Sequence, residues 1–200
     1  MHEEKIKFYA FRELSKKVQD KIIQKYQDDG TYMPYDWYKD VFDMFKDTMS
    51  ETYGFDVDNI QFSGFWSQGD GASFTGEFVD NNKAIDMLLK KDTRLVNLLK
   101  EHVGSIEVIR VSHRYHHKYT VTASVEVTDW NGMTDAEADA LENACLEIEK
   151  RLEVLKDTMC DQLYRELQEW YDNYNNEDFI RACLMDENDE DYLADGTYMI

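Results

Sequence analysis

Basic residues, proline and cysteine are all scarce in this sequence of 200 residues. It has 22 Lys and Arg against 42 Asp and Glu, which gives a formal net charge of -20. This imbalance excludes unassisted binding to DNA, RNA or an anionic membrane, because affinity for phosphate groups depends on a basic surface. No apolar run reaches the roughly 20 residues that a membrane-spanning helix requires, and the first five residues lack the apolar core of a signal peptide. We therefore expect a cytoplasmic protein that contacts neither nucleic acid nor membrane directly.

The three cysteines, Cys145, Cys160 and Cys183, are odd in number and form no Cys-x-x-Cys pair. They are predicted to be reduced thiols rather than a disulfide framework or a metal site. The sequence also contains no phosphate-binding Gly-x-x-x-x-Gly-Lys-Ser/Thr loop and no Gly-x-Ser-x-Gly elbow. No nucleophile, base and oxyanion donor come together along the chain, so we expect no enzyme, no cofactor and no metal.

Acidic residues concentrate in the last third of the chain. Residues 129–200 hold 21 acidic and 5 basic groups, whereas residues 1–128 hold 21 and 17. Such a surface either attracts a basic partner or simply keeps the protein soluble, and the pattern leaves both interpretations open. On one helix face these carboxylates could imitate the phosphate backbone of DNA for a host enzyme. The acidic residues concerned are Glu142, Glu149, Glu153, Asp157, Glu166 and Glu169.

Hydrophobic periodicity predicts helices and two β-hairpins. Residues 60–66 and 72–78 are apolar, aromatic-rich runs on either side of a glycine-rich connection, which is typical of a hairpin. Residues 106–111 and the strictly alternating run 119–127 predict a second hairpin. The predicted fold class is therefore α+β: an antiparallel sheet of about four strands in two hairpins, covered by helices on one face.

Apolar residues recur every three or four positions from a capping box at Thr134 to residue 175, which predicts one long, acidic C-terminal helix. A helix of about 60 Å projects from a compact domain or pairs with a second copy in a homodimer. No linker rich in Pro, Gly or Ser divides the chain, so residues 1–185 are expected to form a single domain. Residues 186–200 are expected to be an acidic, mobile tail. The only proline, Pro34, is expected in the first turn of the second helix.

The connection of the first hairpin is the leading candidate for a binding site. Its residues Trp66, Ser67, Gln68 and Asp70 combine an aromatic ring with polar groups, and two glycines beside them allow backbone amides to line a concave loop. Such a loop can hold an anion or a nucleotide phosphate, while the indole offers a stacking surface for a base. The alternative is a plain turn, in which glycine supplies a positive φ and Asp70 bonds its own backbone.

The connection of the second hairpin is the other candidate. Arg114, Tyr115 and His116 lie there between two further histidines, His113 and His117. Three histidines within five residues suit zinc or acid–base chemistry. However, no carboxylate or cysteine stands at ligand spacing, and the neighbouring Arg114 repels a cation. Contact with a partner or an anion is therefore preferred to metal binding, and a polar hairpin tip without function remains the alternative.

Three blocks of the sequence resemble an uncharacterised family of tailed-phage accessory proteins. The first is FRELS at residues 11–15, which leads into a Lys-rich helix ending in a Tyr. The second, and most specific, is GFWSQGDGASF at residues 64–74. The third is a histidine-containing turn that runs into a strand at residues 113–127. The resemblance implies a phage gene expressed in the bacterial cytosol, and it implies no activity and no catalytic residue.

Two functions from different classes follow from these patterns. The main hypothesis is a protein that binds and inhibits a host bacterial protein, such as a defence component, through the acidic helix, the aromatic hairpin or both. The alternative is a protein that binds or sequesters a nucleotide or another small ligand with the hairpin at Trp66–Asp70. An enzyme that uses Asp70 and His116 as acid and base is the least favoured hypothesis.

Overall fold

The chain forms two compact units that share one long helix. The computed structural model describes residues 6–89, 93–128, 130, 132–187 and 191–199. One unit comprises Tyr38–Leu167, and the other comprises Met1–Trp37 together with Gln168–Ile200. Within the described residues, no helix combines the length and the apolar character needed to cross a membrane.

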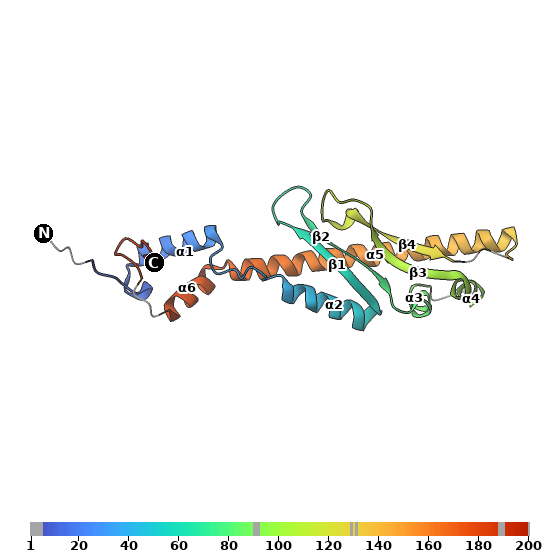
Figure 1. Cartoon of the computed structure of the whole chain (residues 1–200), viewed down its shortest axis with the longest axis horizontal. Coiled ribbons are helices and arrows are strands. Elements are labelled where there is room, and N and C mark those ends of the chain that lie inside the picture. The colour runs from blue at the N-terminus through green and yellow to red at the C-terminus, as the bar shows by residue number, and fades with distance from the viewer. Residues whose placement is uncertain (1–5, 90–92, 129, 131, 188–190, 200) are drawn as a thin grey trace. The chain divides into compact units, whose positions relative to one another are not determined.

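The unit Tyr38–Leu167 is built on a four-stranded antiparallel sheet with the strand order β1-β2-β3-β4. Figure 1 shows these strands side by side, with the long helix α5 passing behind them. The α+β fold class predicted from the sequence is therefore confirmed. The strands are β1 (Phe55–Ser63), β2 (Gly71–Phe78), β3 (Val103–Arg110) and β4 (Val121–Val127), and the helices of this unit are α2 (Lys39–Tyr53), α3 (Asn81–Leu88), α4 (Thr93–His102) and the greater part of α5 (Asp135–Tyr174).

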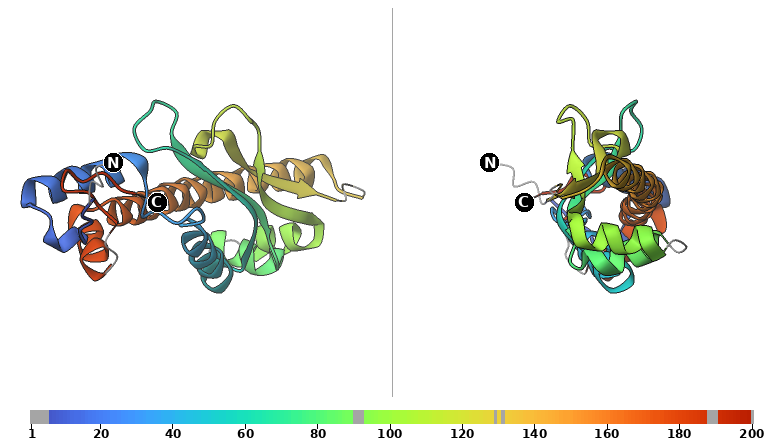
Figure 2. Two further views of the ribbon diagram at one scale, coloured as in Figure 1. Left: turned by 60° about the vertical axis from the view of Figure 1, so that its left-hand side comes forward. Right: turned by 90° about the vertical axis from the view of Figure 1, so that its right-hand side faces the viewer.

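One face of the sheet is buried under helices, and the other face is exposed along β1 but covered in part of β2, where Ser73 is fully buried between Ala72 and Phe74. Along β1, Phe55 and Val57 are buried while Asp56 between them is exposed. The buried face packs on helix α2, where the ring of Phe45 lies 5.2 Å from that of Phe74. Both further views in Figure 2 show that the two hairpin connections project at the same end of this sheet. The alternation of side chains in each strand thus produces the predicted layer of helices on one face.

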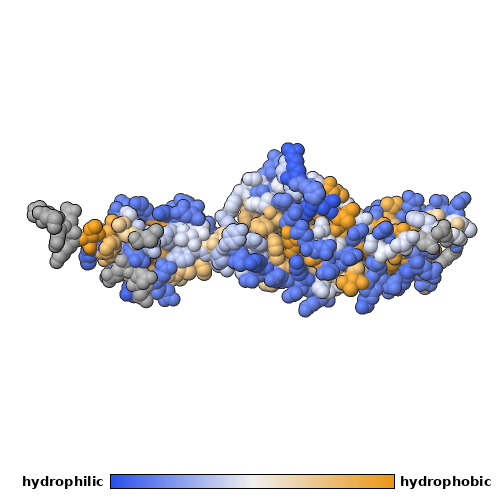
Figure 3. All heavy atoms as spheres, viewed as in Figure 1, coloured by the Kyte–Doolittle hydropathy of each residue, from blue (hydrophilic) through white to orange (hydrophobic). Residues whose placement is uncertain are grey.

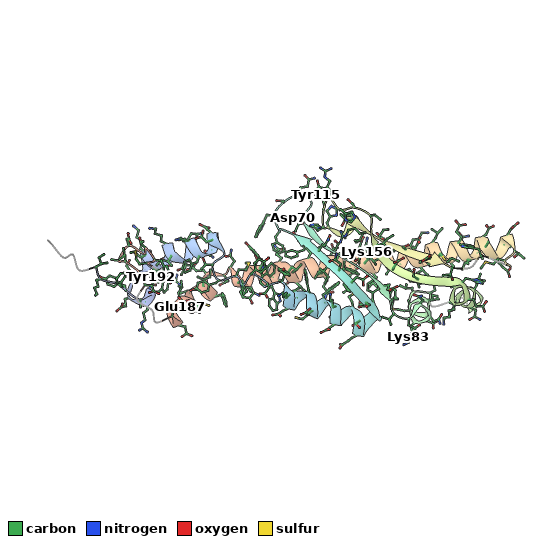
Figure 4. The ribbon with its side chains drawn as sticks, in the orientation of Figure 1. Asp70, Lys83, Tyr115, Lys156, Glu187 and Tyr192 are labelled. Carbon is green, nitrogen blue, oxygen red and sulfur yellow. The ribbon has the colours of Figure 1, made fainter. Side chains whose placement is uncertain are left out.

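Helix α5 also bonds directly to the backbone of the edge strand β4. The carboxylate of Glu153 accepts a hydrogen bond from the amide of Ala123 at 2.8 Å, and that of Glu149 accepts one from Val125 at 3.2 Å. One turn further along α5, the fully buried Lys156 donates to the carbonyl of Val121 at 3.1 Å. Three side chains of a helix therefore take the place of a neighbouring strand along this edge, as Lys156 in Figure 4 illustrates.

The second unit is a small helical cluster built from both ends of the chain. It contains the short 3-10 helix η1 (Phe11–Glu13), α1 (Lys16–Asp29) and α6 (Glu177–Asp186). Tyr192 is 3% exposed, forms a β-bridge with Tyr9 and shares a 2.8 Å hydroxyl–hydroxyl hydrogen bond with Tyr26. Tyr192, from the segment expected to be a mobile tail, therefore belongs to the core of this unit, whose buried members are Phe11, Leu14, Ile22, Ile23, Ile180, Leu184 and Tyr192.

Local sequence signals set some of the helix ends and not others. The capping box at Thr134 forms as predicted, because its hydroxyl accepts from the amide of Glu137 while that carboxylate accepts from the Thr134 amide. Gly54 ends α2 in the left-handed conformation. Pro34, however, does not open α2, so this expectation was wrong: a turn closed by the Trp37 amide and the Pro34 carbonyl comes first, and the helix begins at Lys39.

Candidate functional site

The two hairpin connections contact each other at one end of the sheet. The first connection, residues 64–70, meets the second, residues 111–117, through two glycines. The ring of Tyr115 lies so close to Gly69 that an added Cβ would be 3.0 Å from it, and a Cβ added at Gly71 would lie 2.6 Å from the Cβ and 2.8 Å from the Cα of His117. Figure 4 shows Asp70 and Tyr115 near each other where the two connections project. Residues that the sequence places some 45 positions apart therefore form one surface.

Asp70 closes the first connection from within. Its Oδ2 accepts hydrogen bonds from the amides of Trp66, at 3.0 Å, and of Ser67, at 2.6 Å. The Asp70 amide in turn donates to the carbonyl of Ser67 at 3.1 Å. The two amides that could hold an anion are therefore already bound to a carboxylate of the chain itself.

Large amphipathic side chains stand out from the joined connections. The indole of Trp66 is 71% exposed and the ring of Tyr115 is 41% exposed. The guanidinium of Arg114 lies over the Tyr115 ring, 5.2 Å from its centroid, which favours attraction between the cation and the aromatic face. Figure 3 shows that the projecting end of this unit is largely hydrophilic. These three residues, which we call the tip surface, thus present rings with polar atoms rather than an apolar patch.

The neighbouring histidines point to different places. The imidazole of His116 is partly buried and its Nδ1 lies 3.0 Å from the side-chain oxygen of Gln61 on β1, so it ties the second connection to the far strand of the first hairpin. His117 instead stacks on Tyr115, with ring centroids 5.6 Å apart and planes 19° apart. Its Nδ1 accepts a hydrogen bond from the amide of Tyr119 at 3.3 Å.

A cleft of about 600 Å³ opens beside the tip surface. Three parts of the chain form its walls: the end of the first connection, the turn before β4 and one face of α5. This volume lies in the range typical of small-molecule sites. Its lining residues are Gln68, Gly69, Asp70, Gly71, Ala72, Tyr115, His117, Lys118, Tyr119, Cys160, Asp161 and Tyr164.

The helical wall of the cleft carries an ion pair and a buried thiol. The ammonium of Lys118 donates to Asp161 at 2.7 Å, and this hydrogen bond raises the pKa of Lys118 above its ordinary value. Burial, followed by repulsion from Asp70, raises the pKa of Tyr164, whose hydroxyl donates to the carbonyl of Gly64 at 3.0 Å. Burial raises the pKa of the Cys160 thiol to about 12, so this sulfur is protonated and inert near neutral pH.

Sequence reasoning named some of these residues and missed others. Of the predicted set, Gln68, Asp70 and Tyr115 line the cleft, Trp66 and Arg114 stand on the tip surface, the Ser67 amide serves Asp70, and His116 is bonded to Gln61. The contribution of α5 could not be foreseen, because nothing in the sequence pairs residues 160–164 with either hairpin. The alternating run was expected to begin at residue 119, yet Tyr119 precedes β4 in the 3-10 turn η2 (Lys118–Thr120) and is 73% exposed.

The acidic residues of α5 divide into two groups. Glu149 and Glu153 bond to β4, and Asp157 pairs with the ammonium of Lys156 at 2.9 Å. Glu142 and Glu169 are exposed. In the part of the chain that the structure describes, no three His, Cys, Asp or Glu side chains gather in a way that could hold a metal ion. Some of the carboxylates of α5 thus stabilise the fold rather than face solvent.

The fold and the site define a small α+β protein with an antiparallel sheet, helices on one face and a cleft at the end where both hairpin connections meet. The chain belongs to the family described as Domain of unknown function (DUF8835), whose model matches residues 37–177. A search of curated proteins finds no match, and neither does a search of solved structures. The matched residues span the unit Tyr38–Leu167 completely and include both the tip surface and the cleft.

Proposed function

We propose that this protein is a phage-type accessory protein that binds a host bacterial protein, such as a defence component, and inhibits it by covering part of its surface. The observation that carries the proposal is the tip surface. Trp66 and Tyr115 are exposed on connections that lock together through Gly69, and Arg114 stacks on one of the two rings. Held in this way, the side chains lose little freedom on binding.

The chemistry of the tip surface suits a protein partner. Trp, Tyr and Arg are the residues most enriched among the few that carry the binding energy of protein interfaces. Interfaces that form between separately folded proteins are no more apolar than the rest of the surface. Three such residues on a largely hydrophilic projection fit this description, and the surface needs no chemical step to act as an inhibitor.

Charge supports a partner with a basic surface. The net charge of -20 attracts such a partner over several ångströms and speeds its approach. Glu149 and Glu153 are bonded to β4, so direct contacts fall to the exposed carboxylates, of which Glu142 is one. We therefore assign the specific contact to the tip surface and the long-range attraction to the acidic chain as a whole.

The phage assignment rests on the resemblance of residues 11–15, 64–74 and 113–127 to tailed-phage accessory proteins. Two of the three blocks supply the hairpin connections that meet at the tip surface. The resemblance and the proposed contact with a partner therefore involve the same two connections. A cytoplasmic partner in a bacterial host follows from the same resemblance.

The test is a tagged pull-down from a bacterial lysate at low and at high salt, with mass spectrometry of the bound proteins. Trp66→Ala and Arg114→Ala are compared with Tyr35→Ala, a matched control because Tyr35 is 94% exposed and lies in the other unit. We expect one host protein in stoichiometric amount, weakened by salt, lost in both tip variants and kept in the control. Its purified form should then be inhibited by this protein at a one-to-one ratio.

The proposal is overturned if the tip variants retain the captured protein as well as the control does, since the contact then lies elsewhere. It is equally overturned if the captured protein binds without any loss of its own activity. Far-ultraviolet circular dichroism of each variant confirms that the fold is intact.

A further inference from the structure

Every charged group that lines the cleft already has a partner within the chain. Asp161 is paired with Lys118 at 2.7 Å. Asp70 is bonded through Oδ2 to the two backbone amides of its own connection. A ligand with a charge of either sign would have to displace one of these internal contacts, and paired charges make poor attractors for an incoming ion.

The polar groups of the cleft that have no hydrogen-bond partner among the described residues include no carboxylate and no ammonium. They are the side-chain amide of Gln68, the hydroxyls of Tyr115 and Tyr119, and the Nε2 of His117. Together they provide both donors and acceptors. The free hydrogen-bonding capacity of the cleft therefore matches an uncharged ligand that itself carries donors and acceptors.

The aromatic side chains that line the cleft also restrict the kind of ligand it can bind. Tyr115, His117 and Tyr119 form one aromatic wall, with successive ring centroids 5.6 Å apart. Tyr164, on α5, also lines the cleft. Aromatic side chains bind planar ligands by stacking on their faces.

We propose that this cleft, which shares Tyr115 with the tip surface, binds an uncharged, planar, hydrogen-bonding ligand of the nucleobase or nucleoside class. In this arrangement the ring of Tyr119 stacks on the base and the Gln68 amide bonds to the base edge, as amide side chains do with adenine. The phosphate of a nucleotide adds no affinity, because the ammonium that lines the cleft, that of Lys118, is already paired with Asp161. The site thus distinguishes the base from its phosphate.

The experiment is isothermal titration calorimetry of the full-length protein with adenosine, guanosine, cytidine and thymidine, and with the corresponding 5′-monophosphates. We expect one-to-one binding of at least one nucleoside, with its monophosphate binding equally or more weakly. Gln68→Ala should weaken this binding about three- to tenfold, the range for one neutral hydrogen bond. Tyr119→Ala should weaken it about tenfold or more, whereas Gln24→Ala and Tyr35→Ala, which change exposed residues of the other unit, should leave it unchanged.

Three outcomes overturn the proposal: no nucleoside binds, a monophosphate binds more than tenfold tighter than its nucleoside, or the Gln68 and Tyr119 variants bind as the controls do. The tip variant Trp66→Ala separates this proposal from the proposed function. It should abolish capture of the host protein while nucleoside binding persists, whereas Gln68→Ala should weaken nucleoside binding about three- to tenfold while capture persists.

Discussion

The ammonium of Lys156, on the long helix α5, donates a hydrogen bond to the carbonyl of Val121, the first residue of the edge strand β4, at 3.1 Å. The side chain is fully buried, and its remaining partners are the Lys118 carbonyl at 3.2 Å and the carboxylates of Glu153 and Asp157. One lysine therefore fixes the turn at residues 118–120 against the helix. Since Lys118 and Tyr119 line the cleft, this contact also sets the cleft wall.

Replacing Lys156 by Met should lower the free energy of unfolding by about 3 kcal/mol. The change leaves two carbonyls and two carboxylates without their buried cation, and breaking a buried pair from one side typically costs about 3–5 kcal/mol. Lys150→Met is the matched control, because Lys150 is exposed on the same helix. Urea unfolding of both variants provides the measurement, and an equal, small loss in the two would show that Lys156 has no special role.

Glu153 should make the sheet sensitive to acid. Burial raises the pKa of this carboxyl, but hydrogen bonds from Lys156 and from the Ala123 amide outweigh it and lower the pKa below the ordinary 4.5. The stabilising contribution is therefore present above pH 4.5 and is lost as the pH falls through the lower, folded-state pKa. The difference in unfolding free energy between the native chain and Glu153→Gln should shrink steadily from about pH 6 to about pH 3. A difference that stays constant over this range would contradict the assignment.

Asp70 should act on its own connection and leave the rest of the sheet intact. In Asp70→Ala the amides of Trp66 and Ser67 lose their acceptor, so their hydrogen exchange should become roughly tenfold faster, in keeping with about 1.5 kcal/mol for a charged hydrogen bond. Asp70→Asn retains a side-chain oxygen and should show a smaller change. Exchange measured by NMR at these two amides and at β2 amides tests this, and faster exchange throughout the sheet would mean a wider role.

Tyr192 should make the smaller unit sensitive to alkali. Burial, together with the hydrogen bond to Tyr26, raises the pKa of this phenol above its ordinary value of 10. The neutral phenol contributes its full stabilising free energy below about pH 10, and this stabilisation is lost as the pH rises beyond that value. Tyr192→Phe should cost about 1 kcal/mol at neutral pH and should reduce the alkaline sensitivity of hydrogen exchange in α1. Tyr35→Phe, at an exposed site, should change neither property.

The parts of the fold that depend on local sequence patterns could be predicted. The alternating run before residue 127 marks β4, and the Thr134 capping box marks the start of α5. Pro34 misled the prediction because its ring suits a turn as well as a first helical turn, and the contacts that follow it decide between them. The division of the chain at residue 167 leaves no trace in the sequence, because the helix and its apolar spacing continue through it.

The candidate site was predictable only in its two connections. Gly69 and Asp70 predict a tight connection between two strands, and Arg114 next to Tyr115 predicts an exposed hairpin tip. That the two connections touch depends on the pairing of β2 with β3, which no local pattern encodes. The share of α5 in the cleft depends on how Asp161 and Lys118 meet across 43 positions, a contact that only the packed structure reveals.

The side chains that α5 places along β4 also bear on how copies of this protein behave at high concentration. An open sheet has two edges, and an edge with unused amides and carbonyls is a template for pairing with another chain. Here Glu149, Glu153 and Lys156 occupy those groups on β4. At the opposite edge, β1 carries a bulge between Val57 and Asn59 and exposed aspartates on both sides of Val57, features that discourage edge-to-edge growth. Resistance to β-aggregation is thus built into both borders of the sheet, and the acidic helix supplies one of them.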